Sequence, residues 1–140
     1  MTVSDPHGRA ISEQIRIRWL QRDSAAGWLA GLLFAALSPL RGELYGVPAA
    51  CILGIALVNA SYGAAGLWML GSVACGELAI QRALGRIARA NLVWALLCMV
   101  LAGVALAWAR PLFAAQLFAE GLLVGGLGFY EQRLCRASSR

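Results

Sequence analysis

The sequence predicts an all-α fold, a polytopic membrane bundle of about four transmembrane helices with an amphipathic interfacial helix at the N-terminus. Three observations lead to this prediction. Hydrophobic residues make up 60% of the 140 residues and charged residues only 14%, whereas about 25% of the residues of a soluble domain are charged. The uncharged residues are gathered in long runs. The Arg residues stand between these runs, as they do in the loops of membrane proteins.

The positions of the polar residues predict the domain organisation. Residues 1–23 are expected to form a cytoplasmic, amphipathic N-terminal segment, residues 24–130 the four-helix transmembrane domain, and residues 131–140 a cytoplasmic tail. The longest polar stretch is the N-terminal one, so no soluble domain can be separated from the chain.

The N-terminal segment has the periodicity of a helix. Ile11, Ile15 and Trp19 recur every four residues, which places them on one helical face. A basic amphipathic helix before a membrane span usually lies on the bilayer surface. Asp23 or Ser24 is expected to cap the first span that follows. A secretory signal is the alternative interpretation, but no small-residue cleavage site stands out.

Four apolar runs are expected to form the spans. The first covers residues 24–40, and the third and fourth cover residues 90–109 and 111–130. The second, residues 44–76, holds 33 residues without a charge. This is longer than one span of about 20 residues and shorter than the roughly 40 residues of two spans. One long, tilted helix is the preferred interpretation, and a break near residues 59–63 is the alternative.

The Arg distribution predicts the orientation. Of the 12 basic residues, only Arg41 and Arg110 lie on one predicted side, and the other ten lie on the opposite side. Basic loops face the cytoplasm, so both termini are expected there, in a bacterial inner membrane. Membrane lipid is an expected partner, with Arg86 and Arg89 as candidate headgroup ligands. Nucleic acid is not expected, because the Arg residues flank hydrophobic runs.

Glu120 is the most informative residue. It is the only charged residue of the fourth run and lies near its middle. An ionised carboxylate at that depth costs about 2.5–3.5 kcal/mol, so it is expected to face protein or water, to be paired, or to be protonated. Gln116, one helical turn earlier, is a candidate hydrogen-bond partner. Asn59 is a second polar residue at mid-depth, and a contact between Asn59 and Glu120 is a hypothesis.

Two GxxxG pairs predict close helix packing. Gly27 and Gly31 lie in the first run, and Gly121 and Gly125 lie in the fourth. Small residues at this spacing let two helix backbones approach each other. The sequence leaves open whether the second helix belongs to this chain or to a partner.

Catalytic, metal and cofactor sites are not predicted. The four Cys residues form no CxxC pair and His7 is the only His, so close-spaced zinc ligands and paired haem ligands are absent from the sequence. No nucleophile–base pair or phosphate-binding Gly-rich loop is visible. We therefore expect neither an enzyme nor a cofactor.

Several short motifs occur in the order found in a known family. Residues 54–59 match a Gly-rich second span that ends in Leu-Pro-Asn, with Val58 in place of Pro. Arg86 and Arg89 stand where the family has Glu and Lys, so Arg86 reverses a charge. Residues 111–121 begin with Pro-Leu and contain Leu-Phe-Ala-Glu-Gly, with the Glu inserted. In this order the chain resembles bacterial ATP synthase subunit I, a small four-span protein.

This resemblance implies a non-catalytic accessory or assembly subunit of an inner-membrane complex, which helps to assemble the rotor ring of the ATP synthase membrane sector. Its partners would be other integral membrane subunits or further copies of the same chain. The alternative is a small oligomeric transporter or channel in which Glu120 titrates inside the membrane, and a holin-like pore is a third interpretation. An anchoring Glu120 should tolerate Gln, whereas an ion-coupling Glu120 should not.

Overall fold

The computed structural model describes the backbone of residues 6–71 and 77–136 and the side chains of residues 13–71 and 80–136. Within these ranges the chain is all-helical, as predicted. Five helices follow one another: α1 (Pro6–Ala36), α2 (Ser38–Tyr45), α3 (Ala49–Gly71), α4 (Glu77–Ala107) and α5 (Pro111–Arg136).

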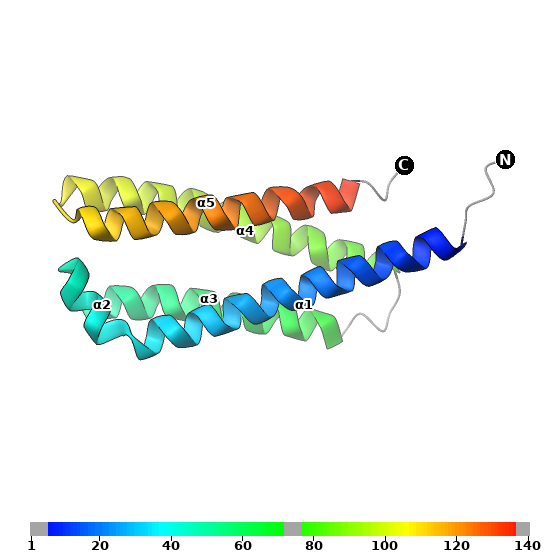
Figure 1. Ribbon diagram of the computed structural model, residues 1–140, viewed down its shortest axis with the longest axis horizontal. Coiled ribbons are helices and arrows are strands. Elements are labelled where there is room, and N and C mark those ends of the chain that lie inside the picture. Colours follow the sequence, from blue (N-terminus) through cyan, green and yellow to red (C-terminus); the bar gives the residue numbers. More distant parts are fainter. Residues whose placement is uncertain (1–5, 72–76, 137–140) are drawn as a thin grey trace.

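The long helices pair into two antiparallel hairpins, one of α1 with α3 and one of α4 with α5 (Figure 1). The contacts within each hairpin are far more extensive than those between the hairpins. The short helix α2 and the turn between α4 and α5 lie at one end of the molecule. The start of α1, the end of α3, the start of α4 and the end of α5 lie at the other end.

Within the described ranges, three helices are long and apolar enough to cross a membrane, which supports the prediction of a membrane protein. They are α3, the 28 residues Ile80–Ala107 of α4, and α5. Helices α1 and α2 add a fourth candidate if they form one span, but a bend of 72° separates them. The bend follows Leu37, and Pro39 lies in the first turn of α2, where its missing amide hydrogen costs no helical bond.

The N-terminal segment does not form a helix of its own. Helix α1 runs unbroken from Pro6 to Ala36, so it passes through the expected boundary at residue 23 without a cap. No Gly or Pro stands between Arg9 and Ala26 to interrupt the helix. Residues 1–5 of the predicted segment, and residues 137–140 of the predicted tail, lie outside the described part of the chain.

The face of α1 that packs inward does not include Ile15 of the predicted apolar stripe. Ile15 is exposed, whereas Arg16 and Leu20 are buried. In a continuous helix the packing of one part fixes the rotation of the rest. Leu20 precedes Gly27 and Gly31 by seven and eleven residues, intervals that return to nearly the same helical face. The packing of these glycines against α3 therefore turns Leu20 inward and Ile15 outward.

The second apolar run contains one long helix, α3, which has no break at residues 59–63. This helix is shorter than the run, because α2 ends within the run at Gly46. Gly46 has a left-handed backbone with φ 62°, a conformation that costs Gly no steric strain. Val47 then donates its amide hydrogen to the Gly42 carbonyl at 3.0 Å. The last predicted residues of the run, 72–76, lie outside the described residues.

Glycines let the two helices of the first hairpin approach each other closely. A Cβ atom at Gly31 would lie 2.6 Å from the Ala60 nitrogen and 2.9 Å from the Ala56 carbonyl oxygen. A Cβ atom at Gly27 would lie 2.8 Å from the Tyr62 ring. One at Gly63 would overlap the backbone of α1. The first predicted glycine pair therefore packs against a helix of the same chain.

The second hairpin is built in the same way. A Cβ atom at Gly121 would lie 3.1 Å from the Ala95 carbonyl oxygen, and one at Gly125 would lie 3.2 Å from the Ala95 side chain. Further along α5, a Cβ atom at Gly128 would lie 3.0 Å from the Ala88 carbonyl oxygen. The second predicted glycine pair also packs inside the chain, between α5 and α4.

Candidate intramembrane binding site

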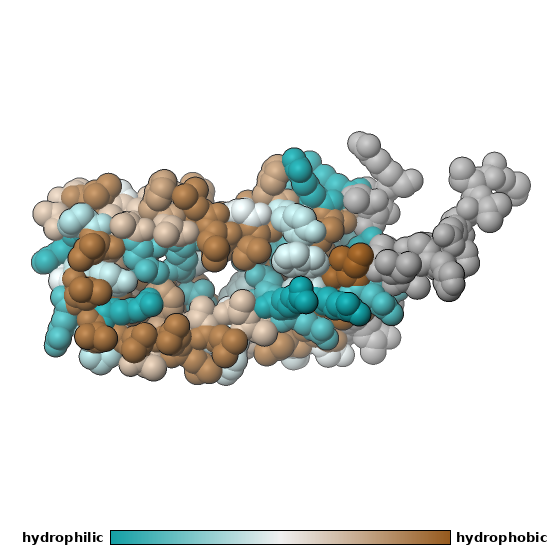
Figure 2. Space-filling view, viewed as in Figure 1, coloured by the Kyte–Doolittle hydropathy of each residue, from teal (hydrophilic) through white to brown (hydrophobic). Residues whose placement is uncertain are grey.

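A cavity of about 640 Å³ lies between the two hairpins. Figure 2 shows the molecule hollowed between them, about halfway along its length. All four long helices contribute to its lining, which is mainly aliphatic and aromatic. The polar and charged side chains that line it are Asp23, Asn59, Tyr62, Asn91, Gln116 and Glu120.

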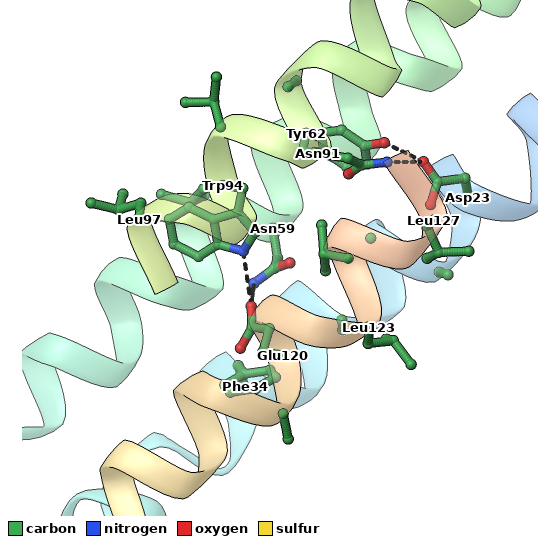
Figure 3. A pocket seen from close by; sticks show the side chains of 18 of the residues that line it. Asp23, Phe34, Asn59, Tyr62, Asn91, Trp94, Leu97, Glu120, Leu123 and Leu127 are labelled. Carbon is green, nitrogen blue, oxygen red and sulfur yellow. Dashed lines mark hydrogen bonds between the residues drawn. The ribbon is translucent and has the colours of Figure 1, made fainter. Parts of the chain in front are cut away.

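Glu120 lines the cavity and joins the two hairpins (Figure 3). Its Oε1 atom accepts hydrogen bonds from Trp94 Nε1 of α4 at 3.0 Å and from Asn59 Nδ2 of α3 at 3.3 Å. Its Oε2 atom is buried and has no hydrogen-bond partner among the described residues. We call Glu120, Asn59 and Trp94 the central cluster. It carries one carboxylate and two neutral donors.

The structure thus places Asn59 and Glu120 in the hypothesised contact, but it pairs Gln116 differently. Gln116 Oε1 accepts a hydrogen bond from the Tyr45 hydroxyl of α2 at 3.2 Å. Although Gln116 and Glu120 share a face of α5, the former is opposite α2 and the latter is opposite α3 and α4. A neighbouring helix therefore supplies a partner to each, in place of the expected bond along α5.

A second polar cluster lies nearer the end of the molecule where α1 begins and α5 ends. Its residues Asp23 and Glu131 border the first and the fourth apolar run. Tyr62 donates its hydroxyl hydrogen to Asp23 Oδ2 (Figure 3). Asn91 Nδ2 donates to the same Asp23 oxygen at 3.3 Å and to Glu131 Oε2 at 3.0 Å. We call Asp23, Tyr62, Asn91 and Glu131 the terminal cluster. It takes one residue from each of the four long helices and contains two carboxylates.

The terminal cluster is shielded from solvent. Asp23 is 8% exposed, Asn91 is 4% exposed and Glu131 is fully buried. Along α5, Glu120 and Glu131 are eleven positions apart, which corresponds to about 16 Å. The two clusters therefore contact separate parts of the space between the hairpins.

Sequence analysis missed Tyr62, Asn91, Trp94 and Glu131, and it treated Asp23 only as a helix cap. The sequence spacing of these residues could have indicated some of them. Glu120 and Glu131 are eleven residues apart, which is three helical turns and the same face. Asn91 and Trp94 are three residues apart and also share a face. Both pairs therefore mark the side of α4 and α5 that faces the other hairpin.

The remaining predicted residues lie elsewhere. Arg86 and Arg89 are exposed on α4, and Arg89 Nε donates to the Gly85 carbonyl oxygen at 3.1 Å. Cys51, Cys98 and Cys135 are free thiols. Among the residues whose side chains the structure describes, no three His, Cys, Asp or Glu residues lie close enough together to hold a metal ion.

Comparison with known proteins gives no relative. No protein-family model matches the chain, and no match is found among curated proteins or among solved structures. The resemblance to bacterial ATP synthase subunit I therefore stays a prediction from short motifs. What is established is an all-helical chain with at least three helices suited to a membrane.

Proposed function

We propose that the protein is a small membrane transporter whose substrate site is the cavity and whose coupling group is Glu120. One observation carries the proposal: a carboxylate with an unpaired oxygen lines a large apolar cavity at mid-span. Ionisable side chains inside a membrane are costly and usually mark transport pathways or proton relays. Apolar pockets with a few convergent polar groups are the usual form of a small-molecule site.

The division into two hairpins supports this proposal. Each hairpin is held by direct backbone approach at glycines, whereas the two hairpins meet through side chains, in two buried apolar clusters and in hydrogen bonds beside the cavity. Two bodies that meet through side chains, with a cavity between them, suit the sliding or rocking motions by which transporters open a site to alternate sides.

The packing of the glycines weakens the case for an accessory subunit. That prediction used Gly27, Gly31, Gly121 and Gly125 as surfaces for partner subunits. All four glycines lie against helices of the same chain. The accessory role remains a prediction, but these residues no longer support it.

We further propose four spans, with α1 and α2 together forming the first, in a bacterial inner membrane with both termini in the cytoplasm. The start of α1, the start of α4 and the end of α5 lie at one end of the molecule. These segments carry nine of the 12 basic residues, which is the arrangement that the positive-inside rule favours.

The experiment is solute uptake by proteoliposomes under an imposed pH gradient, with a panel of cationic, neutral and anionic solutes. We expect the wild type to accumulate at least one solute. Glu120→Gln keeps the size of the side chain but removes the charge, so it should abolish accumulation. Glu43→Gln, on the exposed surface of α2, is the matched control and should leave it unchanged.

Two results would contradict this proposal. One is accumulation by the Glu120→Gln variant at the wild-type rate. The other is the absence of uptake together with recovery of the native protein in a stoichiometric complex with other membrane subunits, which would favour the accessory role.

A further inference from the structure

We infer that the cavity binds a lipophilic organic cation. This inference rests on the proposed function and names the chemical class of its substrate. The first argument is charge. Asp23 and Glu120 are the charged groups among the described residues that line the cavity, and no Arg, Lys or His is among them. Arg41 lies outside the lining, with its guanidinium 4.1 Å from the centre of the Phe34 ring. The field inside the cavity therefore favours a positive charge over a negative one.

The second argument is the carboxylate oxygen of Glu120 that has no hydrogen-bond partner. Trp94 and Asn59 donate to Oε1, while Oε2 is buried without a hydrogen-bond partner in the described structure. A buried carboxylate oxygen is costly unless it meets a donor or a cation. Protein atoms cover Oε2, so a ligand cation supplies that compensation once it displaces this cover, whereas a neutral apolar ligand leaves the oxygen unpaired and an anion repels it. Trp94 also brings an aromatic ring to the carboxylate, and aromatic faces attract cations.

The third argument is the apolar remainder of the lining. Val58, Val93, Leu97, Leu123 and Leu127 give the cavity aliphatic walls. Its volume of about 640 Å³ is in the range of small-molecule sites. A metal cation such as Ca²⁺ prefers six to eight oxygen ligands, but the described central cluster offers only the oxygens of one carboxylate and one amide. The walls therefore select a cation with bulky apolar groups.

The fourth argument is access. Val93 and Leu123 line the cavity, yet each is 68% exposed. They lie on α4 and α5, two of the helices suited to a membrane, so their exposed sides face lipid once the helices cross the bilayer. The cavity thus opens on the lipid side, where a lipophilic cation accumulates before it reaches the protein.

The test is binding of tetraphenylphosphonium to the purified full-length protein in mild detergent, measured by calorimetry. Tetraphenylborate has the same shape and the opposite charge, so it separates charge from hydrophobicity without any mutation. We expect saturable binding of tetraphenylphosphonium and at least tenfold weaker binding of tetraphenylborate. Glu120→Gln should weaken tetraphenylphosphonium binding at least tenfold, and Glu43→Gln should leave it unchanged.

A second variant keeps the test decisive if Glu120→Gln does not fold. Leu123→Trp places a larger side chain at the exposed mouth of the cavity and should weaken binding severalfold. The inference is overturned by equal affinity for the two ions, by the absence of saturable binding, or by a folded Glu120→Gln variant with wild-type affinity.

The failures of the two proposals can be told apart in the same proteoliposomes. If tetraphenylphosphonium binds in a Glu120-dependent manner but is never accumulated, the ligand class stands and transport is wrong. If an anionic or neutral solute is accumulated in a Glu120-dependent manner and tetraphenylphosphonium does not bind, transport stands and the ligand class is wrong.

Discussion

The contacts within the hairpins and those between them differ in kind. Within a hairpin, glycines remove side chains and let backbones touch, as Gly31 does against Ala56 and Ala60. Between hairpins, side chains make the contacts, both in buried apolar clusters such as the one that contains Ile52 and Leu117 and in the hydrogen bonds of the central and terminal clusters. Direct contact between backbones tolerates little displacement, whereas side chains can change rotamer and exchange hydrogen-bond partners. The comparison suggests two rigid units whose junction is the adaptable part.

The terminal cluster should be the most important polar contact between the hairpins. Asn91→Leu removes the amide that bonds both Asp23 and Glu131, and it leaves two buried carboxylates without that donor. Loss of one partner of a buried charged group costs about 3–5 kcal/mol. We expect a decrease of that size in the free energy of unfolding, measured by denaturant titration in detergent micelles.

A second variant, Asn91→Asp, tests how the terminal cluster responds to added negative charge. It keeps the shape of the side chain but adds a third carboxylate, so it should be at least as destabilising at neutral pH. A stability of Asn91→Leu within experimental error of the wild type would show that the terminal cluster does not hold the hairpins together.

The next effect should come from the packing within a hairpin. Gly31→Ala puts a methyl group 2.6 Å from the Ala60 nitrogen, and overpacking of this kind costs about 1–3 kcal/mol. Gly54→Ala is the matched control, because nothing lies within 4 Å of a Cβ atom there. The control should be neutral or should stabilise the helix by up to about 1 kcal/mol. Thermal unfolding of both variants in the same detergent compares them, and equal effects would contradict close packing at Gly31.

The sequence predicted the membrane class and a part of the site, and the reasons are physical. Uncharged runs of sufficient length give helices in a bilayer whatever their neighbours, so α3, α4 and α5 were predictable. Glu120 and Asn59 were conspicuous because a polar group at mid-depth needs a partner, and two such groups at equal depth tend to meet.

The parts that were not predicted depend on tertiary contacts. Asp23 and Glu131 stand at the ends of apolar runs, where charged residues are usually solvated, and only the packing of four helices around Asn91 buries them. The rotation of α1 was not predictable for a similar reason. Its Ile stripe indicated a surface helix, but the glycine contacts with α3 fix which face turns inward. Likewise, a GxxxG pair predicts a close neighbour without indicating which chain supplies it.

The smallest effect should come from Asn59→Leu. This variant removes one of the two donors to Glu120 Oε1, and Trp94 keeps the other. A single hydrogen bond between membrane helices contributes about 0.6 kcal/mol, so the unfolding free energy should fall by about that amount. Tetraphenylphosphonium binding should stay within threefold of the wild type, because the ligand is recognised by the charge of Glu120 rather than by the amide. A loss of stability as large as that of Asn91→Leu would show that the two clusters contribute equally to the free energy of unfolding. The central cluster is free to serve a ligand only if the other contacts between the hairpins, which are the terminal cluster and the buried apolar clusters, supply most of the stability between them.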